Sequence, residues 1–181
     1  MNPARLEQHV CPACRSNRLV LKNAEGPAPD RVESGVIECG GCGATYPVVR
    51  GLPRFVPATN YAASFGFQWN IHARTQLDSH SGLPISHDRL WAAIGGKADL
   101  TGQRVLEAGS GAGRFTEVLA ASGADVTTFD YSSAVDANAA NQAPSPRLHL
   151  FQGNIFEIPL VEGSFDKVIC LGVLQHTPDP E

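Results

Sequence analysis

Residues 105–120 of this 181-residue chain read VLEAGSGAGRFTEVLA, and this stretch decides the fold. Val105 and Leu106 have the character of the end of a buried strand, and the apolar residues after Arg114 share one face of a helix. Between them glycine recurs at every second position, which lets the backbone turn sharply and approach a ligand closely. The stretch predicts a strand, a ligand-binding turn and a helix.

The spacing of the glycines narrows the choice of ligand. A dinucleotide fingerprint, G-x-G-x-x-G, begun at Gly109 would need its third small residue where Arg114 stands, and no Gly-Lys-Ser/Thr follows to make a P-loop. The pattern is instead E-x-G-x-G-x-G, with Glu107 just before the turn. A carboxylate there suits a ligand with an ammonium or sulfonium group better than a pyrophosphate.

A second strand should follow the helix. Gly123 is a suitable helix-ending residue, and the chain can return as a strand over residues 125–129 that leads to Asp130. Nucleotide-binding folds place an acid for the ribose hydroxyls roughly 20 residues after the first glycine, which is where Asp130 lies. In the alternative interpretation Asp130 is a solvated acid that caps a helix over residues 132–141. We favour the ribose role.

Two further strands and two helices complete this part of the chain. Residues 148–152 predict a third strand, and the nearly continuous apolar run 165–174 predicts a strand buried in a parallel sheet. A helix is expected over residues 86–94, and Thr177 with Pro178 announces another.

In order, these motifs resemble those of the class I S-adenosylmethionine (SAM) dependent methyltransferases. The QHTPDP segment at residues 175–180 is similar to that of the group that methylates small metabolites, lipids and sugars. The resemblance implies a partial Rossmann-like domain over residues 86–181, with parallel strands in the order 3-2-1-4. Its implied SAM contacts are Glu107, Gly109 and Gly111 at the methionine end, Gly113 in the same glycine turn, Asp130 at the ribose, Asn154 and Ile155 at the adenine, and Leu171 and Gly172 completing the methionine pocket.

His176 is the candidate catalytic residue. It follows the fourth strand, in the kind of loop where ligands bind in open α/β sheets. It could serve as a general base if the acceptor must lose a proton. In the alternative interpretation it only helps to cap the following helix.

Residues 1–57 form a separate unit marked by two C-x-x-C pairs, at residues 11–14 and 39–42. In a reducing compartment such pairs favour metal over disulfides, and four thiolates can enclose one tetrahedral zinc ion with no open position. We therefore expect a small β-rich zinc ribbon held by Cys11, Cys14, Cys39 and Cys42. The segment resembles the zinc ribbons related to methyltransferase activators. His9 is interpreted as a solvated residue of a frayed terminus and not as a ligand.

Residues 58–85 connect the two units and are rich in aromatic residues. Tyr61, Phe65, Phe67 and Trp69 fall in a stretch without periodicity, which predicts a loop-like connector. The rings could pin the ribbon to the second domain, or they could form part of a lid over the cofactor or acceptor. We favour the first interpretation.

Composition restricts the partners. The chain has a formal net charge of -4, with 43% hydrophobic residues, and it has no basic run. These features argue against nucleic acid as a partner, and no apolar run is long enough for a membrane span. The start lacks a signal-peptide pattern, so a cytoplasmic location is expected.

The sequence thus predicts a SAM-dependent methyltransferase for a small-molecule, lipid or sugar acceptor, with structural Zn²⁺ and a possible protein partner through the ribbon. The resembled fold has seven strands and four are found, so we expect the N-terminal portion of a longer enzyme. Two alternatives stay open. One is an activator or interaction module with a degenerate cofactor fold, and the other is an NAD-dependent oxidoreductase.

Overall fold

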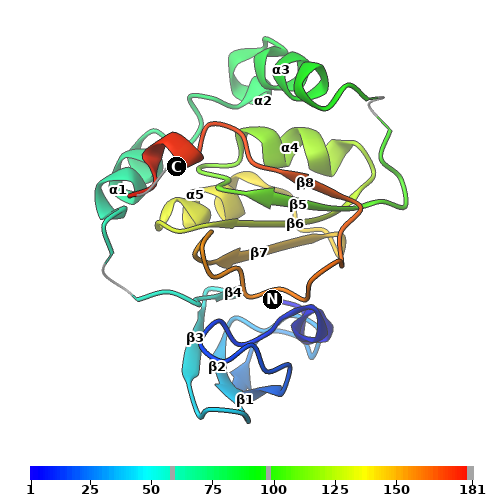
Figure 1. The fold of residues 1–181 in the computed structure, drawn as a ribbon. Coiled ribbons are helices and arrows are strands. Elements are labelled where there is room, and N and C mark those ends of the chain that lie inside the picture. The colour runs from blue at the N-terminus through cyan, green and yellow to red at the C-terminus, as the bar shows by residue number, and fades with distance from the viewer. Residues whose placement is uncertain (58–59, 97–98, 179–181) are drawn as a thin grey trace.

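The computed structural model describes residues 1–57, 60–96 and 99–178. Figure 1 shows a small sheet near the N-terminus below a larger sheet that is flanked by helices. The larger sheet carries the glycine turn, and the small sheet carries the cysteine pairs. The α/β architecture predicted from the sequence is confirmed.

The small sheet is antiparallel and follows the chain in the order β1-β2-β3-β4. A 3-10 helix, Pro3–Gln8, precedes it. Its strands are β1 (Leu19–Glu25), β2 (Ser34–Cys39), β3 (Thr45–Val49) and β4 (Leu52–Pro53). The connections between these strands each contain glycine, a residue typical of turns.

The larger sheet is parallel, with the order β7-β6-β5-β8. Counted along the chain this is 3-2-1-4, which confirms the predicted topology. The strands are β5 (Arg104–Ala108), β6 (Asp125–Asp130), β7 (Leu148–Gln152) and β8 (Lys167–Ile169). Helices α4 (Arg114–Ala121) and α5 (Ala134–Asn141) connect the first three strands.

The fourth strand is shorter than the apolar run predicted. Only Lys167–Ile169 pairs with β5, and the chain then turns through Gly172, which has a φ of 73°, into a 3-10 helix at Leu174–His176. Val168 is 64% exposed because β8 lies at the edge of the sheet. The apolar run therefore predicted a longer strand than the structure has. The helix expected after Thr177 falls largely on residues 179–181, outside the described residues.

The aromatic connector is helical, contrary to the loop expected. It contains α1 (Ala63–Ile71) and α2 (Asp78–Ser81), and α1 packs against α5. Helix α3 (Ile85–Ile94) follows where a helix over residues 86–94 was predicted. Helix α5 lacks large apolar residues, yet its Ala134 and Val135 are fully buried. Its small side chains let the two helices approach. No described helix is long and apolar enough to cross a membrane.

Gly66 sets the distance between α1 and α5. A Cβ added there would lie 2.8 Å from the backbone nitrogen of Ser133, so one of the two helices would have to move. Gly66→Ala should therefore lower the stability by about 1–3 kcal/mol and shift α1 away from α5. Chemical denaturation measures the loss. Ser64→Ala, at an exposed position of α1, is the matched control, and equal effects of the two substitutions would contradict the contact.

The two sheets are joined along β7. Arg54 forms a parallel bridge with Gln152, and the Phe55 N–H donates to the Gln152 carbonyl at 2.9 Å. Phe55 packs edge-on to Phe151, with ring centroids 5.8 Å apart, so one apolar core runs from the ribbon into the larger sheet. The ribbon thus covers the edge of β7 that would otherwise be open.

His9 belongs to this junction, and its interpretation as a solvated residue is wrong. The side chain is fully buried. Its Nδ1 lies 2.9 Å from the Pro159 carbonyl, and its Nε2 lies 2.7 Å from Nε2 of the buried His149. The local sequence gave no sign of this, because the partners of His9 lie 140 and 150 residues away.

Ion pairs surround the same junction. Arg5 pairs with Asp125 at 2.8 Å, and Arg54 pairs with Asp136 at 2.7 Å. Arg54 and Asp136 are each mostly buried, with side chains 10% and 14% exposed, so this pair is far less screened by solvent than a surface pair. Charged groups of the ribbon are therefore fixed to specific groups on the larger domain.

Candidate cofactor pocket and metal centre

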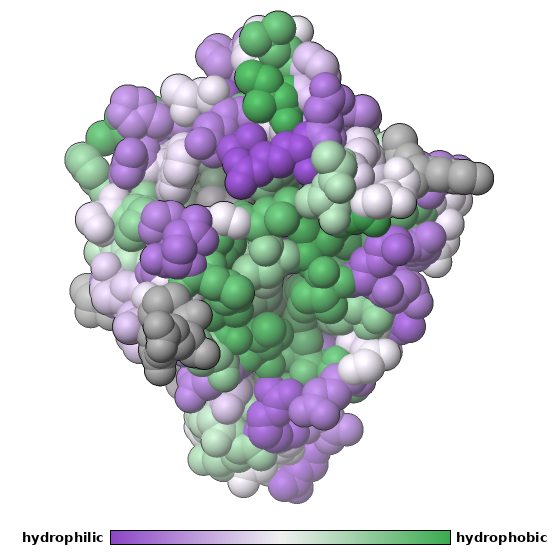
Figure 2. Space-filling view, turned by 45° about the horizontal axis from the view of Figure 1, so that its top comes forward, coloured by the Kyte–Doolittle hydropathy of each residue, from purple (hydrophilic) through white to green (hydrophobic). Residues whose placement is uncertain are grey.

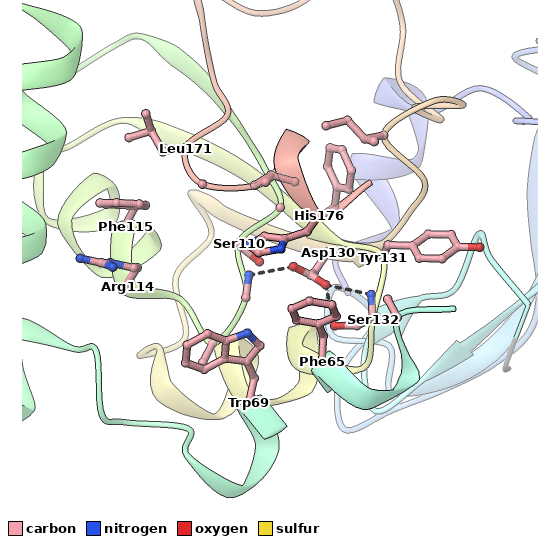
Figure 3. A pocket seen from close by; sticks show the side chains of 18 of the residues that line it. Phe65, Trp69, Ser110, Arg114, Phe115, Asp130, Tyr131, Ser132, Leu171 and His176 are labelled. Atoms are coloured by element: carbon pink, nitrogen blue, oxygen red, sulfur yellow. Dashed lines mark hydrogen bonds between the residues drawn. The ribbon is translucent and has the colours of Figure 1, made fainter. Parts of the chain in front are cut away.

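A cavity of about 320 Å³ opens at the carboxyl ends of β5, β6 and β8. Ligands bind at this edge in open α/β sheets. Figure 2 shows an apolar hollow bordered by hydrophilic surface on the face turned toward the viewer. Figure 3 shows the cavity from close by. Its lining includes Phe65, Trp69, Arg89, Gly109, Ser110, Gly111, Arg114, Phe115, Asp130, Tyr131, Ser132, Ile155, Leu171, Gly172, Val173, Gln175 and His176.

The glycine turn forms the floor between β5 and α4. Gly109 has a φ of 79°, and a Cβ there would run into the side chain of Val173. Gly113 has a φ of 98° and meets the side chain of Asn138 on α5 in the same way. Glycine is therefore required at both positions by conformation and by space. Gly109 and Gly111 line the cavity, whereas Gly113 lies behind it against α5.

Asp130 ends β6 and points into the cavity. One carboxylate oxygen accepts from the Gly111 N–H at 2.8 Å, and the other accepts from the N–H and the hydroxyl of Ser132 at 2.8 and 2.7 Å. Figure 3 shows these bonds. Asp130 therefore holds the glycine turn and the start of the next connection together. The oxygen that accepts from Gly111 has one hydrogen bond among the described residues and so keeps capacity to accept from a ligand.

Glu107 is placed differently from the other predicted contacts. Its side chain is 2% exposed and does not line the cavity. Oε2 accepts from Thr116 and Thr128 at 2.5 and 2.8 Å, while Oε1 has no partner among the described residues. Burial raises the pKa of this carboxyl to about 7, against the opposing effect of the two hydroxyls. Glu107 thus joins α4 and β6 beneath the glycine turn, outside the cavity lining.

The remaining predicted positions divide into two groups. Ile155, Leu171 and Gly172 line the cavity. Asn154 does not line it, and its Oδ1 accepts from the Phe156 N–H at 3.1 Å. The amide side chain therefore shapes its own loop in this structure.

His176 lines the cavity from the 3-10 helix Leu174–His176. Its ring faces Phe65 of α1, with the ring centroids 5.2 Å apart, as Figure 3 shows. A histidine there can exchange a proton with a ligand in the cavity while the aromatic ring restrains its orientation. The residue that the sequence proposes as a base therefore lies at the cavity.

The cavity lining also includes residues that the sequence did not assign to the cofactor site. Phe65 and Trp69 come from α1, so the connector contributes directly to the cavity, as the lid interpretation proposed. Arg114 also lines the cavity, and its Nε donates to the Ser86 hydroxyl at 3.2 Å. The aromatic spacing at residues 61–69 was the available signal for the first two.

The four cysteines of the ribbon converge as predicted. Their sulfur atoms all lie within 4.8 Å of one another, with 3.7 Å between Cys11 and Cys42 and 3.6 Å between Cys14 and Cys39. Four sulfurs about 2.3 Å from a tetrahedral zinc ion lie about 3.8 Å apart, so the spacing fits zinc. Backbone N–H groups, that of Cys42 first, lower the pKa of the Cys39 thiol to about 6. The donor set is therefore suited to a structural ion.

A further contact orients one of these sulfurs. The hydroxyl of Tyr46 lies 3.1 Å from Sγ of Cys11. Such an outer contact fixes a ligand's direction and is common at metal sites.

The fold and the pocket define the second part of the chain as a parallel α/β domain with a cavity over a glycine turn. Residues 106–181 match the protein family described as Methyltransferase domain. Such a domain implies SAM as the cofactor.

Similar proteins agree with this assignment. A ubiquinone biosynthesis O-methyltransferase of Xanthomonas oryzae pv. oryzae is 34% identical over 128 residues, covering 65% of this chain and 49% of the relative. One from Coxiella burnetii is 37% identical over 84 residues, covering 45% and 36%. The chain therefore spans half or less of the length of these relatives.

A solved structure shares the fold. It is a chain of the complex between the Haloferax volcanii Trm112 methyltransferase activator and a protein assigned as a methyltransferase. The TM-score is 0.50 at 21% identity, covering 67% of this chain and 52% of the other. This likeness supports the α/β fold alone.

Proposed function

We propose that the chain is the SAM-binding part of a methyltransferase that acts on a small-molecule, lipid or sugar acceptor. The observation that carries the proposal is the cavity at the carboxyl ends of β5, β6 and β8, where the glycine turn and Asp130 meet within a matched methyltransferase domain. The names of the curated relatives favour oxygen as the methylated atom.

Each predicted contact takes a role consistent with its place. Asp130 would hold the ribose, and Ile155 would pack on the adenine with Asn154 nearby. Leu171 and Gly172 would enclose the methionine end over Gly109 and Gly111. Glu107 and Gly113 would act through the turn that they support.

SAM, when bound, supplies an electrophilic methyl group on a sulfonium. The residues of this chain position the reactants, because an in-line displacement depends mainly on orientation. Phe65 and Trp69 exclude water from one side of the cavity. His176 accepts the acceptor's proton where the reaction releases one.

We propose three units along the chain. Residues 1–57 form a structural zinc ribbon, residues 58–85 the connector that covers the cavity, and residues 86–181 the partial methyltransferase domain. The ribbon is joined to β7 by a strand bridge and by ion pairs, so it would stabilise the second domain within one chain. The Trm112 complex offers an analogy, in which a separate activator accompanies the other protein. A cytoplasmic location stays a prediction of the sequence.

Asp130→Ala should weaken binding of S-adenosylhomocysteine, the demethylated cofactor, by roughly tenfold to a hundredfold, because charge-assisted bonds to the ribose would be lost. Isothermal titration calorimetry of the protein measures it. Asp88→Ala, an exposed acid outside the cavity, is the control. Binding of NAD in place of S-adenosylhomocysteine would favour an oxidoreductase. Failure to bind either, with a protein partner that co-purifies, would favour the activator module.

A further inference from the structure

Helix α5 directs a group of amide side chains at the glycine turn and the start of α4. Asn138, Asn141 and Gln142 are spaced i, i+3 and i+4, so they share one side of the helix end. The Asn138 amide donates to the Thr116 hydroxyl at 2.9 Å, and the Gln142 amide nitrogen lies 3.4 Å from the Gly113 carbonyl. None of the three amides is among the described residues that line the cavity. They therefore contact the turn from outside the ligand's space.

Asn141 bonds two segments that lie far apart in the sequence. Its Nδ2 donates to the Ala73 carbonyl at 2.8 Å and to the Ala112 carbonyl at 2.9 Å. Both partners are carbonyls, which only accept, so the two contacts fix which end of the amide is the nitrogen. Ala73 belongs to the connector just after α1, whereas Ala112 belongs to the glycine turn and lines the cavity. One side chain thus joins the connector to the turn.

The connector brings two aromatic rings to the same cavity. Phe65 and Trp69 share one side of α1, and Figure 3 shows their rings along one wall. The indole nitrogen of Trp69 lies 4.0 Å from the position that a Cβ on Gly111 would take. A shift of the end of α1 would therefore change the space between the Trp69 ring and the glycine turn.

Helix α1 has separate contacts that hold its middle on α5. The Asn70 amide donates to the Ser133 carbonyl at 3.0 Å, and Gly66 allows the close approach to the same residue. Neither contact reaches the glycine turn. Loss of the Asn141 bonds should therefore release the end of α1 that carries Trp69 while the helix stays folded on α5.

We propose that Asn141 is a positioning residue of the cofactor site, which holds the Trp69 ring and the glycine turn at a fixed separation. Asn141 lies outside the cavity lining and acts through the carbonyls of Ala73 and Ala112. Because one amide group makes both bonds, the connector and the turn reach their ligand-binding positions together. The inference rests on the proposed function and adds to it a residue beyond the cavity wall.

A double-mutant cycle on the binding of S-adenosylhomocysteine tests this coupling. Asn141→Leu has a similar volume and no donor, and it should weaken binding by roughly tenfold because two hydrogen bonds are lost. Trp69→Ala removes the ring that Asn141 positions. The combined loss in the double variant should be smaller than the product of the two single losses by roughly threefold or more. Two losses that multiply in full would overturn the inference.

Tryptophan emission separates positioning from general stability. The chain has two tryptophans, so Trp91→Phe leaves Trp69 as the single reporter. In that background Asn141→Leu should move the emission of the ligand-free protein to longer wavelength, because the ring at the cavity becomes more exposed to water. Asn17→Leu removes an exposed asparagine of the ribbon and should change neither the emission nor the affinity.

Further variants guard against a failure to fold. Asn141→Ala, without the bulk of leucine, should show the same two effects, and Asn141→Gln keeps an amide donor and should recover part of both. Weak binding with unchanged Trp69 emission would mean that Asn141 supports the turn alone, which would overturn the coupling. A parent protein that binds no S-adenosylhomocysteine would overturn the proposed function together with the inference. Equal binding by the parent and Asn141→Leu would overturn the inference alone.

Discussion

Removal of zinc is expected to unfold the ribbon and to destabilise the methyltransferase domain with it. Cys11 and Cys39 are almost fully buried, and the sulfurs of the four-cysteine cluster lie close enough for one ion. Structural zinc sites contribute about 10 kcal/mol or more of apparent binding free energy, which exceeds what a small β-sheet can replace. Without the ion the ribbon has too little apolar core of its own to stay folded.

The effect should spread because the ribbon and the larger sheet share a core. Phe55 and His9 pack against Phe151 of β7, so loss of the ribbon exposes that strand. We expect a lower Tm for the whole chain with a chelator, and new hydrogen exchange in β7.

Metal analysis and thermal melts test this prediction. The protein should contain one zinc ion per chain, and Cys39→Ser should behave like the chelated protein. Cys170→Ser, a half-buried cysteine outside the cluster, is the matched control. A chelated protein that kept both its Tm and its β7 protection would contradict a structural role.

The sequence predicted those features that depend on local pattern. The glycine turn and α4 follow from spacing and periodicity near each residue, and the structure has them. The order of the parallel strands came from the resemblance to a known family, and the structure has it too. The cysteine cluster was also predictable, because two C-x-x-C pairs carry their own geometry.

Features that depend on distant partners were not predictable in this way. Helix α1 exists where no apolar periodicity was visible, because Gly66 and the small residues of α5 allow close packing. The pairing of Arg114 with Ser86 and its place in the cavity depend on how α3 meets α4. The burial of His9 is the clearest example, because no residue near it in the sequence indicates that it packs beside His149.

Acidification below pH 6.5 is expected to weaken the junction between the ribbon and β7. His9 Nδ1 faces a carbonyl, which only accepts, so Nδ1 carries the proton and His9 Nε2 accepts from the Nε2–H of His149. This arrangement requires His9 to be neutral, because protonation of its Nε2 would place an N–H against the N–H of His149. Protonation of His149 would instead place a charge in a buried site.

The pKa values give the direction of the pH dependence. Burial lowers the pKa of His9 to about 4 and lowers that of His149 well below its usual value. The unfolded chain, with histidine pKa values of about 6.5, therefore binds more protons than the folded chain between pH 6.5 and about 4. Stability is complete above pH 6.5 and falls as the pH is lowered through that window. His9 alone accounts for about 3 kcal/mol at 1.36 kcal/mol per unit of pKa.

Denaturant unfolding at several pH values measures this slope. His9→Phe/His149→Leu removes both titrating rings while keeping apolar bulk beside Phe55, so its stability should vary much less between pH 6.5 and 4.5. His80→Gln changes an exposed histidine outside the junction and serves as the control. A double variant with the parent's full slope would show that the loss of stability in acid arises elsewhere, because no titrating ring would remain between the ribbon and β7.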